Sequence, residues 1–129
     1  MSEIKSYQDL VVWQKAMDLA VAIYDATRKF PQAELYGFTS QMRRSAASVA
    51  ANIAEGYGRE STGSYIHFLQ TARGSLKELE THVTLALRVQ LLLDEQSGPL
   101  LKQTTTIGIM LNSLIRSLQD RKQLDLVED

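Results

Sequence analysis

Residues 41–56 constrain the fold most, because they favour a helix and yet leave that helix without a single polar face. At about 100° per residue, one side of the helix is apolar and a second side carries mostly small residues. An ordinary surface helix has long charged residues opposite its apolar side, so we expect this helix to contact more than one neighbour. The apolar side consists of Met42, Ala46, Val49 and Ile53, and the small-residue side of Arg43, Ala47, Ala50 and Ala54.

A third side of the same helix is polar. Polar groups that lose contact with water need hydrogen-bond partners. We therefore expect this polar line to form a network with another helix or another subunit, at or beside a subunit interface. Its members are Gln41, Arg44, Ser48, Asn52 and Glu55.

Apolar residues that recur at steps of three and four predict four helices. Ser6 and Asp9 resemble a capping box at the start of the first helix, and Pro31 ends it. Pro99 is expected at the first position of the last helix. The predicted helices cover roughly residues 7–30, 38–57, 62–92 and 99–119, and a charged tail, 120–129, is expected to fray.

The connections between these helices are short, which favours antiparallel neighbours, and no stretch alternates like a strand. We therefore predict an all-α fold, an antiparallel up-down-up-down four-helix bundle. Gly74 lies inside the third predicted helix, at a cost of about 1 kcal/mol relative to alanine. A close approach by the helix at 38–57 would account for this glycine.

The 129 residues fit a single domain, 1–129. The chain has no Cys, which excludes a disulfide, a thiolate nucleophile and a zinc site of the Cys type. Its N-terminal residues lack the features of a signal peptide. Its most apolar run, 83–93, is too short to span a bilayer. We expect a cytoplasmic protein that is not embedded in a membrane.

No catalytic constellation emerges from the sequence. Di-metal sites in helical bundles need Glu-x-x-His motifs, and neither His67 nor His82 has Glu three residues before it. Glu78 lies one turn before His82, but such a pair on an exposed helix is more often solvated than bound to a metal. We expect no enzyme, no catalytic residue, no metal site and no cofactor.

The 14 basic and 15 acidic side chains give a net charge of -1. A chain with this charge lacks the overall electrostatic attraction to phosphates that is typical of a dedicated nucleic-acid binder. Binding of RNA or DNA would therefore need a local patch of basic side chains. The alternative is that these basic side chains form ion pairs with acidic residues of the same chain. Aromatic side chains can stack on bases, but those of this chain lie mainly on apolar stripes. The candidates for phosphate contacts are Lys15, Arg28, Lys29, Arg43, Arg44 and Arg59.

The helix at 41–56 reads Gln41-x-Arg43-Arg44-Ser45-x-x-Ser48-Val49-x-x-Asn52-Ile53-Ala54-Glu55-Gly56. This motif resembles the signature of the bacterial four-helix bundle proteins related to the 23S rRNA intervening-sequence protein. The resemblance extends over roughly residues 7–93, through Trp13-x-Lys15-Ala16 and Phe68-Leu69-x-x-Ala72-x-Gly74-Ser75. It implies an antiparallel bundle that assembles as a ring-like homopentamer.

The same resemblance implies kinship with the accessory proteins of diversity-generating retroelements, which bind nucleic acid and a reverse transcriptase. Two features depart from the family pattern. Ala50 stands where many relatives have Pro, and the near-neutral charge lacks the strongly basic surface of the retroelement accessory protein. Our first hypothesis is a non-enzymatic oligomeric scaffold or adaptor, with itself and an unidentified protein as partners. The alternative is a nucleic-acid-binding accessory protein for RNA or DNA.

Overall fold

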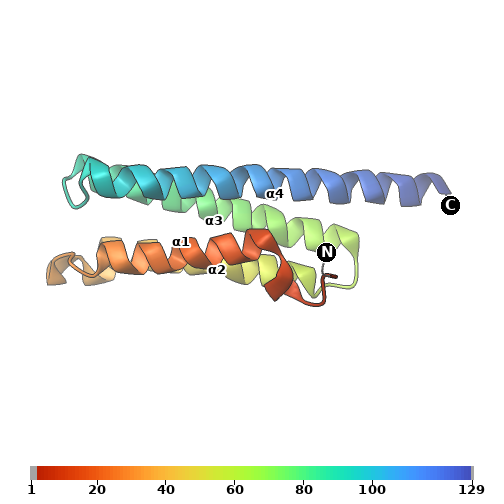
Figure 1. The fold of residues 1–129 in the computed structure, drawn as a ribbon, viewed down its shortest axis with the longest axis horizontal. Coiled ribbons are helices and arrows are strands. Elements are labelled where there is room, and N and C mark those ends of the chain that lie inside the picture. The colour runs from red at the N-terminus through yellow and green to blue at the C-terminus, as the bar shows by residue number, and fades with distance from the viewer. Residues whose placement is uncertain (1–2, 129) are drawn as a thin grey trace.

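Four long helices make up the chain in a computed structural model that describes residues 3–128, and the side chains of residues 3–126 (Figure 1). Short helical turns precede two of them, and no strand occurs between residues 3 and 128, which confirms the all-α prediction. The helices are α1 Val11–Thr27, α2 Ser40–Tyr57, α3 Thr62–Arg88 and α4 Asp94–Glu128. The turns are η1 Tyr7–Asp9, η2 Gln32–Glu34 and η3 Leu35–Thr39.

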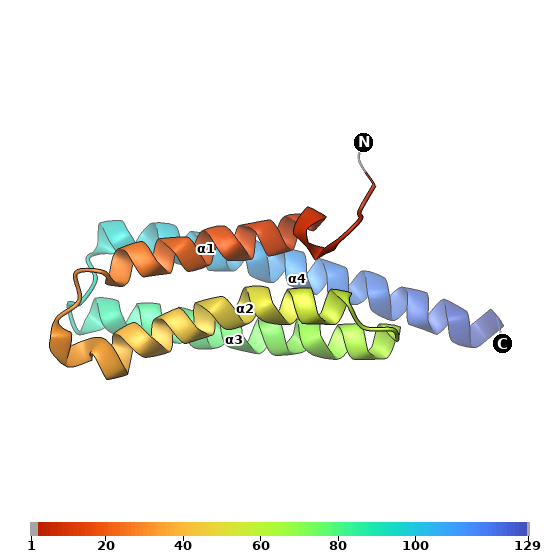
Figure 2. The same ribbon diagram turned by 90° about the horizontal axis from the view of Figure 1, so that it is seen from below.

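The helices lie side by side around one apolar core (Figure 2). Helix α2 packs on α3 and on α1, and α4 packs on α3 and on α1. The predicted apolar side of α2 faces this core, since Met42, Ala46, Val49 and Ile53 are fully buried. Leu19, Leu69, Leu76 and Leu111 are the corresponding buried side chains of the other three helices. No helix in the described part of the chain is long and apolar enough to cross a membrane.

The first helix differs from the predicted span 7–30. Ser6 and Asp9 do form a capping box, in which the Ser6 hydroxyl accepts from the Gln8 N–H at 3.1 Å and Asp9 accepts from the Ser6 N–H at 3.2 Å. This box caps only the single turn η1, because Leu10 is extended with φ -72° and ψ 124°. The α-helix begins after that bend and ends at Thr27, three residues earlier than predicted.

The third helix ends at Arg88 instead of near residue 92. Gln90 adopts a left-handed conformation with φ 68°, and the N–H of Leu91 donates to the carbonyl of Ala86 at 2.8 Å. The N–H of Gln90 donates to the carbonyl of Leu87 at 3.1 Å. This pair of bonds is a Schellman motif, which closes the helix although no glycine marks the position in the sequence.

The fourth helix is longer at both ends than the predicted span 99–119. It starts at Asp94, where Gln96 accepts a hydrogen bond from the N–H of Leu93 at 2.9 Å, so Pro99 lies inside the helix instead of at its first position. Residues 120–128, which were expected to fray, continue α4 as a helix in the structure. They contain neither Gly nor Pro to interrupt the helix. Asp129 lies outside the described residues.

The close approach of two helices expected at Gly74 is not found there, so this expectation is wrong; the close approach occurs at Gly56 instead. A Cβ atom on Gly74 would meet nothing within 4 Å. A Cβ on Gly56 would lie 2.9 Å from the Cβ of Phe68 and 3.2 Å from the carbonyl oxygen of Tyr65. The close approach of α2 and α3 therefore occurs where α2 ends and α3 begins.

Candidate functional site

The middle of the polar line joins α2 to α3. The hydroxyls of Ser48 and Ser75 lie 2.8 Å apart. The side-chain amide of Asn52 donates to the Ser48 carbonyl at 2.8 Å and to the Ser48 hydroxyl at 3.0 Å. All three side chains are partly buried, so each has a partner where water is restricted.

Within the described residues, the two ends of the polar line bond only to residues three or four positions away in the sequence. Arg44 donates to the amide oxygen of Gln41 at 2.9 Å. Glu55 pairs with Arg59 at 3.2 Å, and their side chains are 56% and 44% exposed. An exposed pair of this kind stabilises a protein by about 1 kcal/mol at most. The polar line is therefore three separate groups, of which only the middle one reaches another helix.

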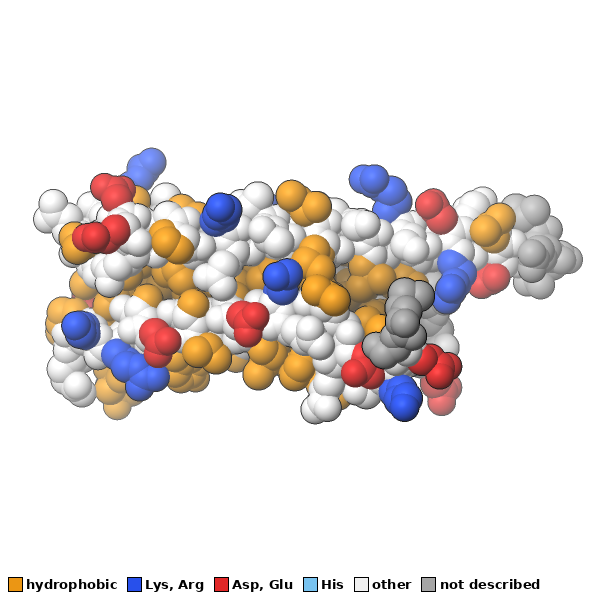
Figure 3. Space-filling model, in the orientation of Figure 1, with side chains coloured by type: hydrophobic (Ala, Val, Ile, Leu, Met, Phe, Trp, Pro, Cys, Tyr) orange, Lys and Arg blue, Asp and Glu red, His pale blue; other side chains and the backbone are white. Residues whose placement is uncertain are grey.

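Beside the polar line, an apolar groove of about 620 Å³ runs between α1 and α2. Alanines of α2 form its floor, because Ala47 and Ala51 point outward when the opposite side of the helix faces the core. Met17 and Val21 of α1 are 41% and 58% exposed along it. Figure 3 shows hydrophobic side chains along this edge of the molecule. The groove is lined by Tyr7, Trp13, Met17, Ala20, Val21, Tyr24, Arg28, Ala47, Ala50, Ala51 and Ala54.

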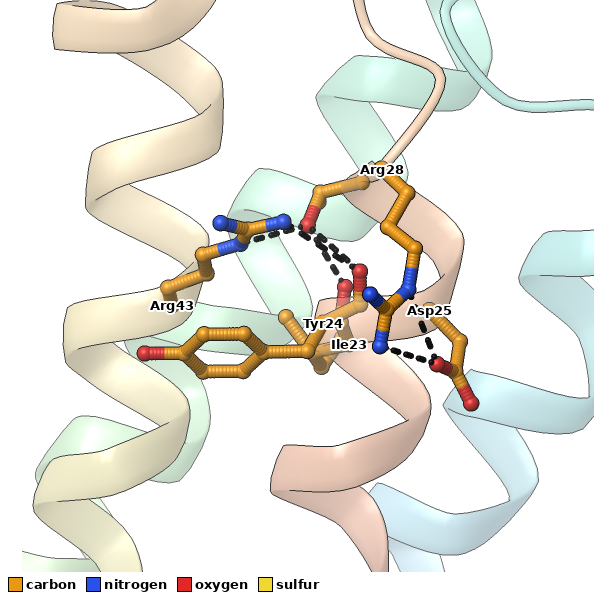
Figure 4. A network of polar contacts seen from close by, with 6 residues as sticks. Ile23, Tyr24, Asp25, Arg28 and Arg43 are labelled. Carbon is orange, nitrogen blue, oxygen red and sulfur yellow. Dashed lines mark hydrogen bonds and ion pairs between the residues drawn. The ribbon is translucent and has the colours of Figure 1, made fainter.

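At one end of this groove, Arg43 ties the start of α2 to the end of α1 (Figure 4). Its Nε donates to the Thr27 hydroxyl at 2.9 Å and its Nη2 to the Tyr24 carbonyl at 3.3 Å. The guanidinium also lies 4.4 Å from the centre of the Tyr24 ring, a cation–π contact. Nearby, Arg28 pairs with Asp25 at 3.0 Å on the exposed side of α1.

A second hollow, of about 430 Å³, lies at the same end, and we call it the end pocket. Tyr36 in the α1–α2 connection is 91% exposed there. Arg43 and Arg44 both line the pocket, and neither has a carboxylate partner within the described part of the chain. The end pocket is lined by Tyr24, Leu35, Tyr36, Thr39, Ser40, Arg43, Arg44 and Ala47.

The structure gathers some of the predicted phosphate contacts and separates others. Arg28, Arg43 and Arg44 lie at the end of α1 and the start of α2, with the exposed Lys29 directly after Arg28. Lys15 lines a different hollow, between α1 and α4, together with Lys102. Arg59 lies at the α2–α3 connection, with its guanidinium 4.6 Å from the centre of the Phe68 ring.

Sequence reasoning missed Leu35 and Tyr36 as members of this region. They stand in a connection of 3-10 and π turns, where no helical period marks which side chains share a face. The sequence did show an aromatic residue, Tyr36, next to Gly37 in the short connection that precedes the helix with Arg43 and Arg44. Such a residue is more exposed than its hydrophobicity suggests.

Among the titratable groups that the structure describes, Tyr65 has a shifted pKa. Burial, with a smaller contribution from Tyr57, raises the pKa of Tyr65 above its ordinary value. A raised pKa keeps the phenol protonated, which makes it a poorer nucleophile. His82 lies 3.6 Å from Glu78. In the part of the chain that the structure describes, no three metal-ligating side chains come together.

Taken together, the fold and the candidate site define an all-α, four-helix protein with an uncovered groove along its first two helices and a basic pocket at one end. The model of the 23S rRNA-intervening sequence protein family matches residues 8–113, and the chain belongs to this family. The resemblance seen in the α2 motif is thereby confirmed.

A solved structure shares this fold. It is the crystal structure of a protein of unknown function from the S23 ribosomal protein family of Bacteroides thetaiotaomicron, and it is 28% identical with a TM-score of 0.74. The similarity covers 81% of this chain and 98% of that one. Comparison with curated proteins gives no match.

Proposed function

We propose that this protein is a non-enzymatic scaffold or adaptor that works as a homo-oligomer in the cytoplasm. In this proposal its helices form an antiparallel up-down-up-down bundle, and the bundles assemble side by side as a ring-like homopentamer. The observation that carries the proposal is the uncovered groove between α1 and α2. Contiguous exposed apolar surface of this kind marks an interaction site.

The alanine floor suits a helix of another subunit. Ala47 and Ala51 are exposed and have the smallest side chains that still favour a helix, so a second backbone can approach α2 closely. Met17 and Val21 then supply apolar side chains beside that floor. The polar line runs along the neighbouring side of α2, where Arg44 and Glu55 remain exposed, and we place it beside the contact.

Native mass spectrometry and light scattering test this proposal. We expect the full chain to be an oligomer at micromolar concentration, and Val21→Glu to shift it towards the monomer. Val89→Glu is the matched control, because Val89 is 51% exposed and lies outside the groove. A monomeric full chain would overturn the proposal, and so would equal effects of the two variants.

A second candidate function is binding of RNA or DNA as an accessory protein. The observation in its favour is the end pocket, where Arg43 and Arg44 line the same hollow as the exposed ring of Tyr36. Cations that contact phosphates and an aromatic ring that stacks on a base are the two parts of a single-strand site. The name of the family points to RNA rather than DNA.

Electrophoretic shift of a labelled RNA measures this binding. Phosphate contacts release counterions, so the affinity must fall steeply between low and moderate salt. Arg44→Glu is expected to abolish the shift, whereas Lys102→Glu, which lies in the separate hollow between α1 and α4, is expected to keep it. Absence of any shift at low salt would exclude this function.

A further inference from the structure

The last turns of α4 extend beyond the rest of the molecule. The family match ends at residue 113, whereas α4 continues to Glu128. Leu118 is the last side chain of α4 to be buried, and every residue from 119 to 126 is exposed. Lys122 still reaches the first turn of α3, since its Nζ lies 3.1 Å from where a Cβ on Gly63 would stand. Beyond it, Figures 1 and 2 show α4 projecting past α2 and α3.

The projecting segment combines leucines with acidic residues. Residues 123–129 read Gln-Leu-Asp-Leu-Val-Glu-Asp, with three acids and no base. Leu124 and Leu126 are 62% and 64% exposed. Two leucines in water at the end of a helix are unfavourable by the apolar area that they expose, so a docking site for this segment would be stabilising.

The end pocket has the complementary composition. Its apolar part consists of Tyr24, Leu35 and Tyr36, which can cover leucine side chains. Its charged part consists of Arg43 and Arg44, whose guanidinium groups lack a carboxylate within the described residues. Hydrogen bonds between guanidinium and carboxylate are among the strongest that side chains form.

The two surfaces of one chain cannot meet. The end pocket lies at the α1–α2 connection, and the C-terminal end of α4 lies at the opposite end of the molecule (Figure 1). The segment that fills the pocket must therefore come from a second copy. We infer that the α4 extension of one copy, residues 123–129, docks in the end pocket of another copy through its leucines and acids.

This inference rests on the proposed self-association and adds an end-to-end contact to the lateral contact at the groove. The two hollows share Tyr24 and Ala47, but Val21 lines only the groove and Arg44 lines only the end pocket, so substitutions at Val21 and Arg44 test the two contacts separately. Because a tail binds a pocket that lies elsewhere on its partner, the end-to-end contact is heterologous. It joins copies, or rings of copies, in one direction along the bundle axis.

Engineered cysteines test the contact directly, because the chain has no Cys of its own. Gln123→Cys in a tagged chain is mixed with Ser40→Cys in an untagged chain, under mild oxidation. Both positions are exposed, and Ser40 lines the end pocket. We expect a disulfide-linked heterodimer. The matched control replaces Ser40→Cys by Glu60→Cys, because Glu60 is also exposed but lies at the α2–α3 connection.

The chemistry of the contact is tested in the same assay with full-length variants. The double variant Leu124→Gln with Leu126→Gln removes the apolar part of the tail, and Arg44→Glu reverses a charge of the pocket. We expect each of these two changes to lower the rate of cross-linking about tenfold, as the loss of one contact of moderate strength would. Asp125→Arg in the tagged chain is expected to restore part of the rate lost through Arg44→Glu in the other.

Equal cross-linking to Ser40→Cys and Glu60→Cys would overturn the inference, and so would rates that these substitutions leave unchanged. Neither result would bear on the lateral oligomer, which is tested separately by the oligomeric state of the Val21→Glu variant. Binding of single-stranded RNA in the end pocket, without any cross-link to the tail, would assign the pocket to nucleic acid and also overturn the inference.

Discussion

The hydroxyl of Ser48 on α2 lies 2.8 Å from the hydroxyl of Ser75 on α3, and Asn52 completes the group from one turn further along α2. This is the point at which the polar line crosses between helices. A hydrogen bond inside a protein contributes about 1 kcal/mol, and more when its loss leaves a buried partner unsatisfied. The group therefore positions α2 against α3 in addition to the apolar core.

Replacing Asn52→Leu should lower the free energy of unfolding by about 1–3 kcal/mol, because the Ser48 hydroxyl and carbonyl lose a donor at a partly buried site. Ser75→Ala should cost about 1 kcal/mol, since Asn52 still contacts Ser48. Urea unfolding measures both, with the exposed Ser117→Ala as control. If Asn52→Leu unfolds at the same urea concentration as the native chain, the group does not stabilise the fold.

Two glycines should respond in opposite directions to the same substitution. Gly56→Ala places a Cβ 2.9 Å from that of Phe68, so we expect it to destabilise the protein by about 1–3 kcal/mol. Gly74→Ala meets nothing within 4 Å on an exposed helical position and should stabilise it by about 1 kcal/mol. Thermal unfolding of the two variants side by side decides this. Equal shifts would contradict the packing described at the α2–α3 turn.

This pair of glycines also shows how far the sequence predicts the fold. The helical period predicted the buried side of α2 correctly. Met42, Ala46, Val49 and Ile53 are spaced by three or four residues, which places them on one face of the helix, and all four are fully buried. A single glycine carries no such repeat. Whether a glycine permits a close contact between helices depends on a neighbouring residue that is distant in the sequence. The close approach of α2 and α3 was therefore predicted at Gly74, although it occurs at Gly56.

The ends of helices and the end pocket were harder to predict for a related reason. The end of α3 depends on the left-handed Gln90, a conformation that glycine usually marks. The length of α4 depends on the absence of any stop signal beyond residue 119. The end pocket combines residues from α1, α2 and their connection, and no local pattern relates Tyr24 and Tyr36 to the paired arginines.

Gln90→Gly should stabilise the protein by about 1 kcal/mol, because a residue with a Cβ is strained at φ 68° and glycine is not. Gln90→Ala keeps the strain and serves as the control. Chemical unfolding of the two variants gives the difference. A Gly variant that is no more stable than the Ala variant would show that the strain at this position is negligible.

Stability at high pH should depend on Tyr65. Burial raises the pKa of its phenol in the folded state above the ordinary value of 10.0, so the folded chain holds this proton more tightly than the unfolded chain. The stabilisation is complete below pH 10.0 and is lost as the pH rises through the folded pKa. Tyr65→Phe should flatten the fall in the free energy of unfolding above that pH. The exposed Tyr36→Phe is the control, and an equal effect of both variants would contradict the burial.

Arg43 and Tyr24 should stabilise the protein as a coupled pair. The guanidinium lies 4.4 Å from the ring centre and also donates to the Thr27 hydroxyl and the Tyr24 carbonyl. In a double-mutant cycle with Arg43→Gln and Tyr24→Leu, we expect a coupling energy of about 0.5–1 kcal/mol, as for a cation–π contact at a partly exposed site. Most of the cost of Arg43→Gln alone should remain in the Tyr24→Leu background, because the hydrogen bonds to Thr27 and to the backbone do not need the ring. Additive effects of the two substitutions would assign the whole contribution of Arg43 to those hydrogen bonds.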